Sequence, residues 1–454
     1  MKLRVDRDAL GDAVSFVARA LPTRPVVPVL SGLLVEADGD RLTLSCFDYE
    51  VSARVTVAAD VGEPGTALVP GRLLAEICKS LPPAEVEIVM AAGMVMLTCG
   101  SAEFALVALP LEEYPALPEL PTAAGTVDGG FLATAAAQVV PSASRDDTLP
   151  MLTGVCLDFD GQTLTLAATD RYRLAVRTVT WAPSDPALRA SALVPARTLA
   201  DVARSMGPAG PVTIAFGQPG QDATRPADGM ISFEGGGRRL TARLIGTEFI
   251  RYQSRFPASF EATAELAAGP FLEAVRRVSL VADRASPVQM AFRRGVVVIE
   301  ARSDGRARAV ESVPVTFHGT EQMISFSPQY LLDGITAAAL SGHALSGHAL
   351  SGQGRPHAAG DADVVPAPGA GRIRLEFSSP AKPALISWID GDATAGAGAH
   401  DPVLADSVPP AGNGAVTVPA GLDAPGAPGR AEHRPAEAAA FRYLVVPLRV
   451  PVVG

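Results

Sequence analysis

Cysteine is scarce in this chain of 454 residues, and signal-like or membrane-spanning stretches are missing from its sequence. The cysteines show no CxxC spacing, which favours reduced, buried thiols of an intracellular protein over a disulfide framework. The first residues, MKLRVDRDAL, are charged and contain no apolar core of a signal peptide. The longest nearly uncharged apolar stretch, residues 88–99, is too short to cross a bilayer. We therefore expect a cytoplasmic protein without membrane contact. The cysteines are Cys46, Cys78, Cys99 and Cys156.

Histidine and lysine are also few, and their positions disfavour common catalytic sites. None of the three lysines follows a GxxxxG phosphate loop. His318 precedes a glycine, and the other histidines lie in low-complexity sequence, where solvated loop residues are a better interpretation than metal ligands. The sequence thus predicts no enzyme, no cofactor and no metal site. Those other histidines are His343, His348, His357, His400 and His433.

Apolar residues and arginine are abundant. Hydrophobic residues make up 48% of the chain, enough to build several cores, and 35 of the 38 basic residues are arginine. The net charge of −10 argues against a uniformly basic nucleic-acid binder, but it leaves room for a locally basic face.

An internal repeat organises the chain. Residues 28–44 match residues 150–166 at an offset of 122 (150 − 28), and the same offset carries Asp48 onto Asp170. A second match relates VPGRLLAEICKSLP at Val69 to VPARTLADVARSMG at Val194, an offset of 125 (194 − 69). A fainter third copy includes FSPQYLLDG at Phe326. We predict three related domains. Their ranges are 1–121, 126–257 and 258–454.

Each copy carries the signals of two helices and several antiparallel strands. Apolar residues keep helical spacing over 10–21, and a second helix is predicted over 72–81. Between them, Asp38-Gly39 predicts a tight hairpin turn. This order is typical of an α+β fold rather than of an alternating parallel sheet.

Two segments of the third domain differ in composition from the rest. Residues 339–371 begin with an ALSGH tandem repeat, and residues 391–440 consist mostly of Ala, Gly, Pro and Asp. Such sequence buries too little apolar area to offset its ordering entropy. We predict two disordered insertions, because strand-like sequence resumes after each.

Four arginines stand at loop ends or helix starts: Arg24, Arg72, Arg145 and Arg197. A guanidinium beside a helix N-terminus can hold a phosphate group. Arg72 and Arg197 occupy equivalent repeat positions, which favours a shared functional surface. The apolar run at 443–450 is open to two interpretations, a buried edge strand or the wall of a peptide groove.

Several motifs together point to one family. PTRP at Pro22, SRDDTLPML at Ser144, ATDRYRLA at Ala168, FSPQYLLDG at Phe326 and YLVVPLRV at Tyr443 resemble the bacterial DNA polymerase III β subunit, the sliding clamp. The resemblance implies a head-to-tail homodimeric ring that encircles duplex DNA and tethers the replicative polymerase. It also implies that polymerase, clamp loader and repair proteins share one peptide-binding cleft between domains 2 and 3.

The resemblance also assigns residues. Arg24, Arg72, Arg145 and Arg197 are expected near DNA. Phe104 and Leu106 are expected to pack against Leu280 and Val281 of a second chain. The cleft is expected to use Leu152, Thr169, Arg171, Tyr172, Arg173, Leu174, Ser254, Tyr330, Val446, Pro447, Leu448 and Arg449, with Arg173 and Tyr330 bonding the peptide backbone.

Two alternatives to the replicative clamp stay open. One is a clamp paralogue specialised for repair or drug tolerance, which the long insertions favour. The other is a three-domain hydrolase that uses scattered aspartates and glutamates.

Overall fold

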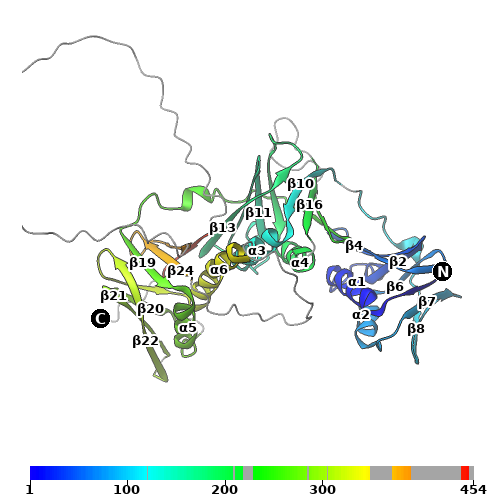
Figure 1. Ribbon diagram of the computed structural model, residues 1–454, viewed down its shortest axis with the longest axis horizontal. Helices are drawn as coiled ribbons and strands as arrows, with labels where there is room; N and C mark the ends of the chain where they lie inside the picture. The colour runs from blue at the N-terminus through cyan, green and yellow to red at the C-terminus, as the bar shows by residue number, and fades with distance from the viewer. Residues whose placement is uncertain are drawn as a thin grey trace, which may run out of the picture.

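The chain forms an arc of three lobes, as Figure 1 shows. The helices lie on the concave side of the arc and the strands on the convex side (Figure 1). The predicted α+β fold and the threefold repeat are confirmed, because each lobe pairs two helices with antiparallel strands in the described residues. This computed structural model describes residues 1–119, 121–207, 210–217, 229–283, 286–303, 305–347, 371–389 and 441–448.

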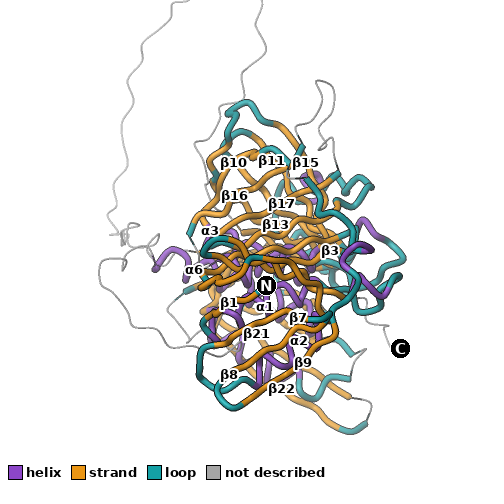
Figure 2. Tube along the Cα trace, turned by 90° about the vertical axis from the view of Figure 1, so that its right-hand side faces the viewer, coloured by secondary structure: helices purple, strands orange, loops and turns teal. Residues whose placement is uncertain are grey.

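The first domain begins with a short strand, and the predicted helix follows it. Asp6 caps α1 (Arg7–Ala20) by accepting a hydrogen bond from the Ala9 amide, and Val14 and Val17 are buried in the core. The predicted hairpin also forms, with Gly39 at a φ of 59°. The second helix is α2 (Gly71–Ser80). The strands are β1 (Lys2–Val5), β2 (Gly32–Asp38), β3 (Arg41–Phe47), β4 (Val51–Ala58), β5 (Asp60–Glu63), β6 (Gly65–Pro70), β7 (Val86–Ala91), β8 (Met94–Cys99) and β9 (Ala102–Val107). Figure 2 views the arc from this end, with β1, β7 and β9 toward the viewer.

The second domain repeats this order. Its helices are α3 (Gly129–Val139) and α4 (Ala196–Met206). Its strands are β10 (Ala123–Asp128), β11 (Gly154–Asp160), β12 (Thr163–Thr169), β13 (Arg173–Thr180), β14 (Ala182–Pro183), β15 (Arg189–Pro195), β16 (Pro211–Phe216), β17 (Met230–Gly235) and β18 (Arg238–Arg243).

The third domain contains α5 (Ala268–Ser279) and α6 (Pro328–Gly347). Its strands are β19 (Ala262–Ala267), β20 (Val288–Arg293), β21 (Gly295–Ser303), β22 (Ala307–His318), β23 (Gln322–Phe326), β24 (Arg372–Phe377), β25 (Ala384–Ile389) and β26 (Phe441–Val445).

Sheets continue across both domain boundaries. In the described part of the chain, β4 of domain 1 pairs with β18 of domain 2, and β13 of domain 2 pairs with β26 of domain 3. The domains are therefore joined through main-chain hydrogen bonds rather than through loose linkers. None of the described helices is both long enough and apolar enough to cross a membrane.

Helix α6 corrects the predicted start of the first insertion. It runs through Gly347, so residues 339–347 are helical rather than a loop. Alanine and leucine, which recur in the ALSGH repeat, favour a helix, and they extend the helix that begins at Pro328. The rest of that segment up to residue 370, and the second segment at 391–440, lie outside the described residues. The four cysteines are free and buried, as predicted.

Two helix glycines provide a matched test of this packing. A Cβ on Gly334 of α6 would lie 2.5 Å from the Tyr443 ring of β26, whereas a Cβ on Gly11 of α1 meets nothing within 4 Å. We expect Gly334→Ala to lower the free energy of unfolding by about 1–3 kcal/mol through overpacking. Gly11→Ala should raise it by up to about 1 kcal/mol, because glycine destabilises a helix interior.

Thermal unfolding of both variants, followed by circular dichroism, measures these opposite shifts. Equal stabilisation by the two alanines would contradict the close approach of α6 to β26.

Candidate functional site

A groove lies where the sheet passes from domain 2 to domain 3. It is a cavity of about 530 Å³ between the loop that ends at Leu152, the turn that connects β12 to β13, residues 250–255 and the chain after β26. The structure therefore places residues from distant parts of the sequence in one cavity. The predicted cleft residues that line it are Leu152, Thr169, Arg171, Arg173, Leu174, Ser254 and Val446.

Leucines form the apolar part of this groove. Leu152 and Leu174 are each 5% exposed and Leu444 is 4% exposed. Leu444 and Val446 stand two residues apart, a spacing that puts side chains on the same face of an extended chain. This spacing of two residues could have identified Leu444, which the sequence prediction omitted. Three further lining residues were also missed, namely Ile250, Arg255 and Pro383.

The chain after β26 forms one edge of the groove. The Val446 amide donates to the Tyr172 carbonyl at 2.8 Å, and the Leu448 amide donates to the Ser325 carbonyl at 2.8 Å. These bonds hold the segment between domains 2 and 3. Pro447 and Leu448 belong to this segment but do not line the cavity, and Arg449 lies outside the described residues.

Two tyrosines predicted for the cleft stack beside it. The rings of Tyr172 and Tyr330 are stacked with centroids 6.1 Å apart, and the Arg173 guanidinium lies 4.6 Å from the Tyr330 centroid. Tyr172 is 49% exposed, so this pair offers aromatic surface next to the groove.

Arg173 is held within the chain rather than pointing free into the groove. Its Nε donates to Asp170 at 2.9 Å, and its Nη atoms donate to Asp333 of α6 and to the Pro141 carbonyl. Burial opposes its charge, but Tyr443, Asp333 and Asp170 outweigh this effect and raise the pKa of Arg173. The guanidinium thus joins β13 to α6 through three of its five N–H groups, and Arg173 also lines the groove.

The turn before β13 has a copy in domain 1. The Asp170 carboxylate accepts hydrogen bonds from the backbone amides two and three residues later, and Asp48 does the same in its own turn. Arg171 and Tyr49, at equivalent positions, both have a positive φ, 82° and 72°. The offset that the sequence assigned to Asp48 and Asp170 therefore marks a shared backbone conformation.

A second group of predicted residues gathers where α1, α2 and α4 meet on the concave side. A cavity of about 730 Å³ is lined by Arg72 and Arg197, and a neighbouring one of about 300 Å³ by Arg24 and Arg197. Arg145 lines neither cavity and is exposed in the loop before Leu152.

The sequence prediction missed three further basic residues of this cluster, Arg19, Lys79 and Arg204. The repeat contains the signal for two of them, because the offset of 125 relates Lys79 to Arg204 (204 − 79). Lys79 pairs with Glu76 at 3.0 Å and Arg204 pairs with Asp201 at 2.5 Å, and each carboxylate stands one helical turn before its partner.

The cluster also closes the C-terminal end of α1. Arg72 donates to the carbonyls of Leu21 and Pro22, and Arg197 donates to the carbonyl of Arg19. Burial lowers the pKa of Arg19, and Asp201 acts in the opposite direction. The surface is basic but regularly interrupted by carboxylates, which weakens its attraction for any one anion.

The four residues predicted for a subunit interface lie at the two ends of the arc. Leu280, after α5, is 84% exposed, and Val281 and Phe104 are partly buried. Leu106 is 2% exposed and faces the core of its own domain, so it has almost no side-chain surface to offer a partner. Its neighbour Val107 is 67% exposed.

Known families match nearly the whole described chain. The family models for the DNA polymerase III beta subunit match at residues 1–118 for its N-terminal domain, 126–250 for its central domain and 253–342 for its C-terminal domain.

Individual relatives agree with these matches. The chain is 49% identical to the beta sliding clamp of Streptomyces coelicolor, over 74% of this chain and 88% of that one. It is 47% identical to the beta sliding clamp of Micrococcus luteus, over 70% of this chain and 99% of that one. The crystal structure of the DnaN sliding clamp of Pseudomonas aeruginosa bound to griselimycin has the same fold, with a TM-score of 0.74 and 22% identity over 99% of this chain and 100% of that one.

Replacing Arg173 tests its role as a connection between domains. Arg173→Ala leaves the carboxylates of Asp170 and Asp333 without their cation, and loss of one partner of a buried pair costs about 3–5 kcal/mol. Both carboxylates keep some solvent contact, so we expect the lower end of this range. The matched control Arg171→Ala removes an exposed arginine two residues away and should change stability little. Urea unfolding that gives the same midpoint for both variants would contradict this role.

Proposed function

The chain belongs to the DNA polymerase III β-subunit family, and we propose from this that it is a DNA sliding clamp. Two chains close head to tail into a ring around duplex DNA, and the ring tethers the replicative polymerase to its template. The observation that carries this proposal is the three-lobed arc with helices on its concave side (Figure 1). The protein acts in the cytoplasm and performs no chemical step itself.

The concave surface suits a ring that must slide. Enclosure rather than affinity keeps the protein on DNA, so contacts to phosphates need to be weak and independent of sequence. Arg24, Arg72 and Arg197 provide such contacts beside Lys79 and Arg204. The nearby carboxylates keep the attraction low, and the overall charge of −10 adds no long-range attraction for phosphates.

Strand edges at the two ends of the arc support closure of the ring. In the described part of the chain, β9 is the edge of its sheet. At the other end, β22 pairs with β21 along its length but meets β19 only at residues 316–318. Antiparallel pairing of β9 with the open part of β22 in a second chain satisfies both edges. Leu280 and Val281 then pack near Phe104 of the other subunit.

The groove between domains 2 and 3 is the binding site for partner proteins. Its leucine floor suits a leucine or phenylalanine side chain, while the edge formed by residues 446–448 accompanies an extended peptide. The polymerase, the clamp loader and repair proteins share this one site and therefore exclude one another.

Topology separates a clamp from an ordinary DNA-binding protein. After loading by the clamp loader, the protein should remain on nicked circular DNA during gel filtration and should leave when the circle is cut. Leu280→Asp places a charge in the interface and should abolish retention, while Leu149→Asp, which alters a partly exposed leucine in domain 2, should not. Equal retention on circular and linear DNA, or a wild-type protein that is monomeric at micromolar concentration, would refute the ring.

Salt dependence tests the basic cluster. The logarithm of the DNA-binding constant falls linearly with the logarithm of the salt concentration, and each phosphate contact contributes about 0.9 to the steepness of this fall. Arg24→Ala combined with Arg197→Ala should therefore make the slope shallower by about 2. Arg189→Ala removes one arginine from strand β15, where Arg189 pairs with Asp160, and serves as the control for each single arginine variant. Fluorescence anisotropy on duplex DNA measures the slope, and an unchanged slope would remove these arginines from the DNA surface.

A further inference from the structure

We propose that a second cavity next to the groove binds a lysine or arginine side chain of the same partner peptide, through the carboxylate of Asp158. This inference rests on the proposed role of the groove as a peptide site. According to this proposal, the clamp recognises a basic residue of the partner peptide in addition to the apolar side chain that enters the groove.

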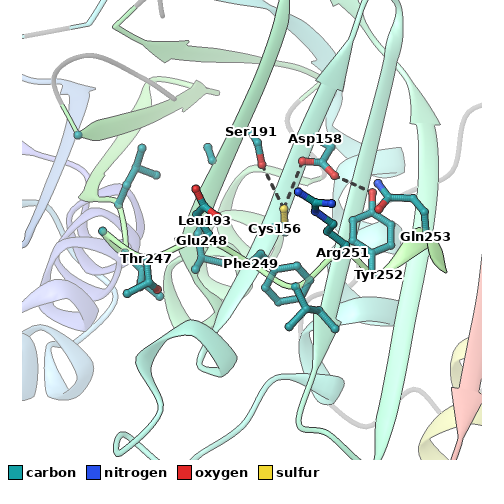
Figure 3. A pocket seen from close by; sticks show the side chains of 16 residues that line it. Cys156, Asp158, Ser191, Leu193, Thr247, Glu248, Phe249, Arg251, Tyr252 and Gln253 are labelled. Carbon is teal, nitrogen blue, oxygen red and sulfur yellow. Dashed lines mark hydrogen bonds between the residues drawn. The ribbon is translucent and has the colours of Figure 1, made fainter. Parts of the chain in front are cut away.

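The cavity lies over the outer face of the domain 2 sheet and has a volume of about 370 Å³. Figure 3 shows Cys156 and Asp158 of β11 and Ser191 of β15 on one side, with Tyr252 from the connection to domain 3 opposite them. Ile250 lines both this cavity and the groove, so the two are adjacent. An extended peptide advances by about 3.3 Å per residue, so a side chain a few positions from the one in the groove reaches this cavity.

Asp158 is held by two hydrogen bonds but forms no ion pair with another described residue. The Tyr252 hydroxyl donates to its Oδ2 at 2.7 Å and the Cys156 thiol donates to its Oδ1 at 3.3 Å (Figure 3). Burial raises the pKa of both donors, and the nearby Asp158 raises them further, so both keep their protons. None of the ion pairs among the described residues involves Asp158, although this carboxylate is partly buried. A partly buried carboxylate without an ionic partner binds most strongly to a cation that also donates hydrogen bonds.

The repeat supplies an internal comparison. The offset of 122 relates Asp158 to Glu36 of domain 1 (158 − 36), and Glu36 pairs with Arg54 at 3.8 Å. The position equivalent to Arg54 in domain 2 is Val176 (176 − 54), which cannot pair with Asp158. Domain 2 thus keeps the carboxylate and lacks its cation at a place where a cavity opens beside the groove.

Other charged groups border the cavity without neutralising Asp158. Arg251 and Glu248 lie on the exposed connection that covers it. The Arg442 guanidinium stands over the Phe256 ring at 4.3 Å from its centroid. Arg251 is the basic side chain of this chain that competes with the peptide for Asp158, so its removal should favour binding of the peptide's cation.

Peptide binding provides the test. The probe is a fluorescein-labelled peptide that carries the clamp-binding segment of the replicative polymerase, with each flanking position replaced in turn by lysine or by uncharged norleucine. At one flanking position, lysine should bind about tenfold more tightly than norleucine, as expected for a hydrogen-bonded ion pair. Asp158→Asn should remove this gain and leave the affinity of the norleucine peptides unchanged.

Two variants serve as controls for the charge. Tyr252→Phe removes a hydrogen bond to Asp158 but no charge and should preserve the lysine gain, whereas Arg251→Ala should increase it. Thermal unfolding checks that all variants are folded. Binding of the norleucine peptides without any gain that depends on Asp158 overturns the cavity proposal alone. Failure of every peptide to bind the wild-type protein overturns the groove as a peptide site, and the cavity proposal with it.

Discussion

Main-chain hydrogen bonding across the domain boundaries is the constraint on which the rest of this structure depends. Ser52 of β4 lies opposite Thr241 of β18, and Arg173 of β13 lies opposite Val445 of β26. Because these junctions are strand pairs, the angle between neighbouring domains follows from register and from sheet twist. The concave row of helices is therefore a property of the backbone and tolerates considerable variation in surface side chains.

The same constraint builds the groove. Once β26 pairs with β13, the residues after it pass the turn that precedes β13, and Leu444 of the strand and Val446 beyond it line the cavity. Gly334 allows α6 to lie against the strand, and Arg173 joins the strand layer to that helix. The peptide site is thus a consequence of how two domains are joined, which explains why its walls come from distant parts of the sequence.

The repeated units keep the same turn conformation but differ in an ion pair on the strands. The turn at Asp48 and the turn at Asp170 keep the same hydrogen bonds and the same positive φ. The pair of Glu36 with Arg54, by contrast, has no counterpart around Asp158. A turn conformation is required wherever the fold is repeated, whereas an ion pair on the outer face of a sheet contributes little stability and can diverge toward binding.

The repeated unit, its helices and its hairpin could be predicted from the sequence, since spacing, capping residues and Asp-Gly turns are local signals. The sequence also identified most of the groove, because these residues stand in recognisable motifs. Packing between elements decided that Leu106 faces inward, that Arg173 pairs with Asp170 and Asp333, and that Ile250, Arg255 and Pro383 reach the groove. Those outcomes depend on which surfaces meet when domains pack, and no local pattern of residues encodes that geometry.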